Sequence, residues 1–301
     1  MIWLGGGCVG LAGVFLVKYS VEQGLLGPGA RIIAGLCMGL ALHVGAEYLR
    51  RHLQPHPSFA ALAGGGSITL FATLLSALQM YQLIAPGLAF TLMALVALLT
   101  LWLARLHGPV LAALGMLGAY IVPILVSTGS GNAISALIYT LIITASTLLL
   151  LRHVYRPWLW WGLLAGSLGW WFITLDMPEA DGFRGLYLAL VAYLLCAIPT
   201  LDWGLKQPLT IDSEHWRLRD KGLPPLAALL LPSLAVIIAA QGFSIAALGF
   251  AQVADSATGA LTLLIQWLPL SAVILLVARQ REHLAPLPWL LFGAQLLAWL
   301  L

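Results

Sequence analysis

Eleven apolar stretches fill this 301-residue chain, and its basic residues fall almost entirely in every second gap between them. About 20 helical residues cross the roughly 30 Å hydrocarbon core of a bilayer, which is close to the length of most of these stretches. The pattern predicts an all-α fold, a polytopic transmembrane helix bundle of about eleven helices within a range of ten to twelve. In chain order, the expected helices are Ile2–Val17, Ile32–Leu49, Phe59–Gln79, Gly87–Ala104, Val110–Val126, Ala133–Leu151, Trp158–Leu175, Gly185–Trp203, Leu223–Ala240, Gly259–Ala278 and Leu287–Leu301.

The composition excludes an ordinary soluble domain. Charged residues make up 8% of the chain and the mean hydropathy is +0.98, whereas soluble domains carry about 25% charged residues. We therefore expect membrane lipids against most of the surface. The net charge is +3, but the sequence contains no segment dense in Lys and Arg with interleaved aromatic residues, so no nucleic-acid partner is expected. The three cysteines all lie in apolar stretches, which favours free thiols over disulfides.

Lysine and arginine divide unevenly between the gaps, and this division predicts an orientation. Eleven of the 14 follow even-numbered stretches: Arg50, Arg51, Arg105, Arg152, Arg156, Lys206, Arg217, Arg219, Lys221, Arg279 and Arg281. The other three, Lys18, Arg31 and Arg184, follow odd-numbered stretches. Because loops rich in basic residues stay in the cytoplasm, the N-terminus is expected to be cytoplasmic.

The second stretch is the most regular segment. Its special residues recur every four positions: Arg31, Gly35, Gly39, His43, Glu47 and Arg51. Four residues advance a helix by about 6 Å and rotate it by about 40°, so successive members of the series share a face. Gly35 and Gly39 form a small-residue notch against which a partner helix is expected to pack closely.

His43 and Glu47 are the first substrate-binding candidates. His43 is expected about 10 Å inside the cytoplasmic boundary, where an ionisable side chain is costly unless it faces the bundle interior or water. The alternative is structural: a neutral His43 with one hydrogen bond, and a Glu47 that pairs with Arg50 or Arg51 at the interface.

Two glycine-rich segments supply the other candidates. Gly65 and Ser67 belong to the run 64–67, where consecutive glycines either break the helix or allow very close packing. Tyr120 and Pro123 lie in the fifth stretch, where the missing N–H of Pro123 predicts a kink. Interrupted helices expose backbone groups to substrates in transporters, but packing explains such kinks equally well.

No sequence motif names a reaction. Asp176, Glu179 and Asp181 lack the alternating oxygen pattern of a calcium loop, so a solvated loop is expected there. No phosphate-binding loop, zinc motif or nucleophile elbow is found, and we expect no cofactor and no metal site, with the catalytic residues unknown. The segment Phe243–Val253 is apolar but too short to span, which indicates a re-entrant or interfacial piece.

A family resemblance follows from several motifs. They are Val14–Tyr19, Gly24–Arg31, Gly45–Glu47, Gly64–Gly66, Leu114–Pro123 and Ser127–Ser130. These motifs resemble a bacterial family of predicted membrane proteins, the domain of unknown function 2339, most closely over residues 1–150. The resemblance implies an inner-membrane location and supplies no activity. Family members are usually longer, so residues 1–301 are expected to form a single transmembrane domain that is a piece of a longer architecture.

Three functions remain open. The first is a transporter-like or channel-like protein with its site near the second, third and fifth helices. The second is a membrane-embedded enzyme that acts on a lipid-linked or envelope substrate, and the third is a scaffold for envelope machinery. The small number of intramembrane charges disfavours a proton-driven pump, and the absence of clustered nucleophiles or acids in the sequence makes an enzyme the weaker hypothesis.

Overall fold

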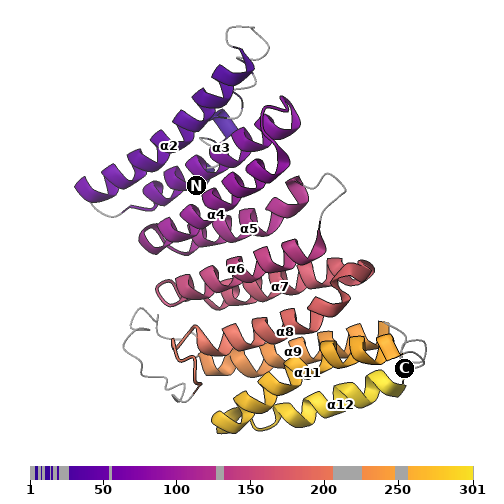
Figure 1. Cartoon of the computed structure of the whole chain (residues 1–301). Coiled ribbons are helices and arrows are strands. Elements are labelled where there is room, and N and C mark those ends of the chain that lie inside the picture. Colours follow the sequence, from indigo (N-terminus) through magenta and orange to yellow (C-terminus); the bar gives the residue numbers. More distant parts are fainter. Residues whose placement is uncertain are drawn as a thin grey trace. The chain divides into compact units, whose positions relative to one another are not determined.

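A computed structural model describes residues 27–53, 56–126, 132–205, 226–247 and 257–300, together with isolated positions between residues 4 and 19. Every regular element in this part of the chain is helical (Figure 1). The α-helices are α2 (Pro28–His52), α3 (Pro57–Gln79), α4 (Pro86–His107), α5 (Pro109–Val126), α6 (Ala133–Leu151), α7 (Pro157–Ile173), α8 (Asp181–Ala197), α9 (Leu226–Ala247), α11 (Ala257–Gln280) and α12 (Leu287–Leu300). Short 3₁₀ turns, η1 (Thr174–Asp176), η2 (Pro178–Ala180) and η4 (Glu282–Leu284), lie between them.

Proline and local capping explain where many helices begin. Pro28, Pro57, Pro86 and Pro157 open α2, α3, α4 and α7, positions at which a missing N–H costs no intrahelical bond. Asn132 caps α6, and its side-chain oxygen accepts from the backbone N–H groups of the second and third helical residues. Each start therefore follows from chemistry that is local in the sequence.

The structure confirms the all-α transmembrane class. Eight helical segments of the described chain are long and apolar enough to cross a membrane. The expected bounds differ from the observed ones mainly at helix ends. The expected bounds Gly185–Trp203 are wrong by about one turn at the start and more than one and a half turns at the end, because α8 already begins at Asp181 and gives way to turns after Ala197. The short piece expected at Phe243–Val253 is also wrong in part, since residues 243–247 continue α9 and 248–253 lie outside the described residues. Most of Ile2–Val17 also lies outside them.

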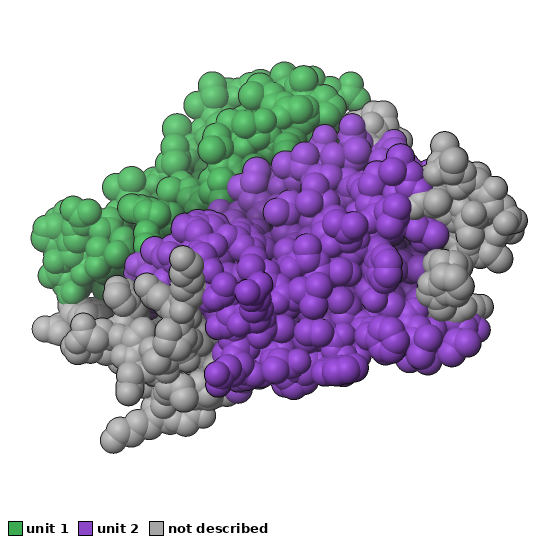
Figure 2. Space-filling model, turned by 60° about the horizontal axis from the view of Figure 1, so that its bottom comes forward, with its two compact units in different colours: residues 1–131 green, residues 132–301 purple. Residues whose placement is uncertain are grey.

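The helices form two compact units, residues 1–131 and 132–301 (Figure 2). In the first unit, α2 packs along α3 and α4 along α5, while α3 also contacts α4 and α5. Short connections make these neighbours antiparallel. Helix α3 is central, since 67% of its membrane-spanning segment is buried. In the second unit, α8 packs on α11, α12 on α9, and α6 on α7 and α8.

The outer surface is apolar, as lipid contact requires. Large side chains such as Ile33, Leu40 and Val44 are more than half exposed along α2. Trp158 and Trp289 are exposed as an interfacial aromatic belt predicts. Trp160 is not part of such a belt, because it is fully buried and its Nε1 donates to Ser233 Oγ at 2.9 Å.

Candidate functional site

The face of α2 that carries the residues recurring every four positions packs against α3. Its buried residues are Arg31, Gly35, Gly39, His43 and Ala46. A methyl group added at Gly66 of α3 would lie 2.9 Å from the Gly39 carbonyl oxygen and 3.1 Å from His43 Cδ2. The glycines therefore bring the two backbones together without breaking α3, and they place His43 at the contact.

A chain of three polar side chains crosses from α2 to α4 at this contact. His43 Nε2 lies 3.3 Å from Ser67 Oγ, which lies 2.8 Å from Thr100 Oγ1. All three side chains are buried, with His43 8% exposed and Thr100 fully enclosed. Counting 1.5 Å per residue from the nearer helix ends, they lie about 10–15 Å inside the bundle.

The hydroxyl of Thr100 determines which atoms donate and which accept in the hydrogen bonds among His43, Ser67 and Thr100. Thr100 Oγ1 donates to the Val96 carbonyl oxygen at 2.7 Å, which uses its only hydrogen. Thr100 must then accept from Ser67, and Ser67 in turn accepts from His43 Nε2–H. This assignment leaves the neutral His43 ring with an acceptor lone pair on Nδ1. Among the described residues, the buried Nδ1 has no hydrogen-bond partner.

A partly open cavity of about 260 Å³ lies at the end of the same three helices. Its lining is Arg50, His56, Pro57, Phe59, Ala60, Leu106 and His107. His107 of the lining and Thr100 of the inner polar chain lie on the same helix, about 10 Å apart along α4.

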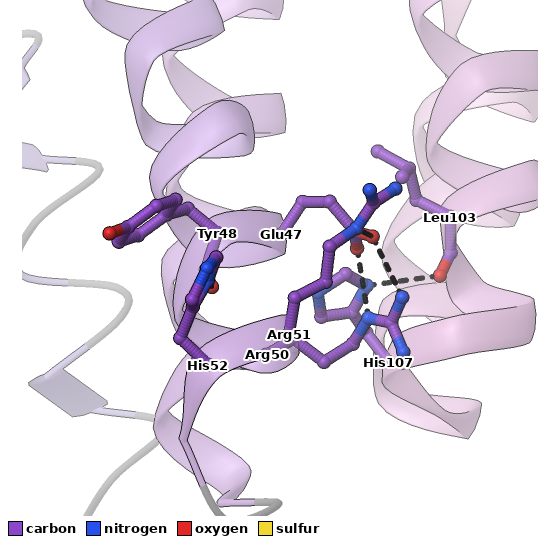
Figure 3. Close-up of polar contacts among 7 residues, drawn as sticks. All are labelled: Glu47, Tyr48, Arg50, Arg51, His52, Leu103 and His107. Atoms are coloured by element: carbon purple, nitrogen blue, oxygen red, sulfur yellow. Dashed lines mark hydrogen bonds and ion pairs between the residues drawn. The ribbon is translucent and has the colours of Figure 1, made fainter.

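Glu47 belongs to the rim and not to the inner chain. Its carboxylate accepts from Arg50 Nε at 2.8 Å, from Arg50 Nη2 at 2.7 Å and from Arg51 Nε at 2.6 Å. Figure 3 shows both arginines reaching to this carboxylate, with His107 of α4 beside them. The structural interpretation of Glu47 as the partner of its neighbouring arginines therefore describes its contacts.

The other sequence candidates lie at different places in the first unit. Gly65 is buried on α3, where its carbonyl accepts from Thr69 at 2.9 Å. Tyr120 and Pro123 lie on α5, about 16 and 21 Å from its start. By contrast, Gly115, where an added methyl group would lie 3.2 Å from Thr100 Cβ, is only about 9 Å from that start. The structure thus brings together His43 and Ser67, and it adds Thr100.

Sequence reasoning missed Thr100. The available signal was a single threonine in the otherwise apolar stretch 92–104. Thr91 on the same helix also donates to a carbonyl four residues back, but it is exposed. Only the packing of α3 on α4 distinguishes the two threonines.

The acidic residues near α8 bind protein groups. Glu179 Oε1 accepts from the backbone N–H of Ala133 at 3.0 Å, and Asp181 pairs with Arg184. Arg184 is 1% exposed and donates to the carbonyl oxygens of Thr174 and Leu175. Within the described ranges, no group of three or more His, Cys, Asp or Glu side chains could hold a metal ion. The loop expected to be merely solvated is instead tied to the ends of α6, α7 and α8.

The second unit contains a buried polar group that the sequence analysis did not identify. Gln241 Nε2 donates to the Gln266 carbonyl oxygen at 2.9 Å, and Ser244 Oγ donates to Gln266 Oε1 at 3.2 Å. Gln266 Nε2 in turn donates to the Asp181 carbonyl oxygen at 2.9 Å. These bonds join α9, α11 and α8, which indicates a packing role.

The family model described as "Predicted membrane protein (DUF2339)" matches residues 1–301. The chain therefore belongs to this family, and the match extends well beyond the first 150 residues in which the motifs were found. No curated protein and no solved structure matches the chain.

Proposed function

We propose that this member of the family is a transporter-like or channel-like protein of the inner membrane, and that His43, Ser67 and Thr100 form its polar path. The observation that carries the proposal is a buried histidine whose Nδ1 has no hydrogen-bond partner in the part of the chain that the structure describes. Ionisable groups inside a membrane are costly, so they usually mark a site or a relay. A proton or a hydrogen-bond donor on a small polar solute would satisfy Nδ1.

The cavity at the helix ends supports an access route. His107 lines it and lies on the same helix as Thr100, about 10 Å along α4 from the inner polar chain. The positive-inside rule places Arg50 and Arg51 in the cytoplasm, which makes this rim the cytoplasmic mouth of the proposed path. Movement of α2 against α3 would then open or close the path, because the glycine contact leaves little space between the two backbones.

The test is flux in liposomes. The full chain is reconstituted into liposomes loaded with a pH-sensitive dye, and proton flux and the permeation of small neutral solutes are both measured. We expect at least one flux to exceed that of empty liposomes, and His43→Gln to abolish the gain, since glutamine cannot bind and release a proton near neutral pH. His153→Gln is the matched control, because His153 is exposed between α6 and α7.

Two outcomes would reject the proposal. One is a folded wild-type protein with neither flux above the empty liposomes. The other is a His43→Gln variant with the same flux as the wild type. The enzyme and scaffold hypotheses predict no His43-dependent flux.

A further inference from the structure

We propose that the cavity at the end of α2, α3 and α4 binds the phosphate headgroup of an anionic phospholipid. The cavity is lined by Arg50, His56 and His107 together with the apolar side chains of Phe59 and Leu106. An amphipathic lining of this kind fits a charged headgroup together with the start of its acyl chains. This proposal is independent of any flux through His43.

The available hydrogen-bond donors suit an anion. Arg50 uses Nε and Nη2 for Glu47, and no described residue accepts from its Nη1. The Nδ1 of His107 faces the Leu103 carbonyl oxygen at 3.2 Å, so Nδ1 is the donor there. Its buried Nε2 has no partner in the described part of the chain, and it becomes a donor when the ring is protonated. A phosphate could therefore accept from Arg50 Nη1, and from His107 Nε2 in the imidazolium form of the ring.

The charge at the rim is net positive despite Glu47. One carboxylate faces the two arginines, Arg50 and Arg51, which leaves one positive charge before any histidine is protonated. The first turn of α3 also lines the cavity, and its N-terminal end carries the positive pole of a 23-residue helix. His56 Nδ1 is occupied by Ser58, with a distance of 2.7 Å to Ser58 Oγ.

Depth favours a lipid over a free anion. The cavity lies where three membrane-length helices end, which is the level of the lipid phosphates. Basic pockets between transmembrane helices at this level recognise anionic headgroups. A volume of about 260 Å³ is smaller than a typical small-molecule site and leaves room for a headgroup whose chains remain in the bilayer.

The experiment compares two neighbouring arginines. The full chain in detergent is titrated with short-chain phosphatidylglycerol, with phosphatidylcholine of the same chain length and with inorganic phosphate. Bound molecules are counted by native mass spectrometry, and thermal stability is recorded in parallel. Arg50→Gln is compared with Arg51→Gln, because both substitutions break a bond to Glu47 but only Arg50 lines the cavity. His107→Gln is compared in the same way with His52→Gln, which is exposed on α2 and outside the lining.

We expect phosphatidylglycerol to bind and stabilise the wild type, Arg51→Gln and His52→Gln. In Arg50→Gln and His107→Gln its affinity should fall about tenfold, as the loss of a charge-assisted hydrogen bond implies. Circular dichroism checks that each variant is folded. Equal binding of phosphatidylglycerol and phosphatidylcholine would overturn the proposal, as would equal affinities of Arg50→Gln and Arg51→Gln. Stabilisation by inorganic phosphate equal to that by phosphatidylglycerol would assign the cavity to a free anion and overturn the lipid assignment.

Discussion

Gly39 of α2 faces Leu70 of α3 so closely that a methyl group added at Gly39 would lie 2.6 Å from Leu70 Cδ2 and 3.2 Å from the Gly66 carbonyl oxygen. Leucine can move, but the backbone carbonyl cannot move without displacing α3. This contact sets the distance between the two helices that hold His43 and Ser67.

Gly39→Leu should destabilise the protein through overpacking, by about 1–3 kcal/mol. Leu40→Ala is the matched control, because Leu40 is 51% exposed on the outer face of α2 and its truncation leaves no internal void. Thermal unfolding in detergent checks the difference. A melting temperature of Gly39→Leu at or above that of Leu40→Ala would contradict the close contact.

Thr100→Val should destabilise the protein by about 0.6–1 kcal/mol, because Ser67 loses its nearest hydrogen-bond partner inside the bundle. In the variant the Ser67 hydroxyl would be free to donate instead to the Ala63 carbonyl oxygen, 3.3 Å away, which limits the cost. The control is Thr91→Val on the same helix, since Thr91 is exposed. Equal decreases of the unfolding midpoint in the two variants would argue against a stabilising hydrogen bond between Ser67 and Thr100.

The orientation of the chain can be tested by cysteine labelling. In a background lacking Cys8, Cys37 and Cys196, a cysteine at Met177 should react with an impermeant maleimide in intact cells, because this exposed residue lies between α7 and α8 on the expected outer side. A cysteine at His153 should react only after permeabilisation. Labelling of the His153 position in intact cells would reverse the proposed orientation.

His283 should make stability depend on pH near neutrality. His283 is exposed, but partial desolvation and then the charge of Arg281 lower the pKa of its ring below the ordinary value of 6.5. The unfolded chain therefore binds this proton more tightly, so the contribution of His283 to stability is complete above about pH 6.5 and is lost as the pH falls below it. Between about pH 7.5 and 5.5, the melting temperature of the wild type should fall more than that of His283→Gln. Parallel pH profiles of the two proteins would show that the ring does not contribute.

Parts of the site could be predicted from local sequence, and other parts could not. The four-residue spacing of Gly35, Gly39 and His43 placed them on one helix face, because helical geometry is a property of the segment itself. Glu47 satisfied the same spacing but pairs with Arg50 and Arg51. Spacing describes a face, and it does not reveal which side chains compete for a charged group.

Hydropathy and the basic residues by themselves determined the class of the protein, the number of its helices and its expected orientation. Each of these depends on the transfer of single segments between water and lipid. Only the tertiary structure decided that Thr100 completes the polar series from His43 and that Arg50, His56 and His107 share a cavity. It also decided that no described residue binds Nδ1 of His43. Lipid is as apolar as the helices, so hydrophobicity does not select which helices pair. That choice comes from the fit of particular surfaces, such as Gly39 against Gly66, between segments that the sequence keeps far apart.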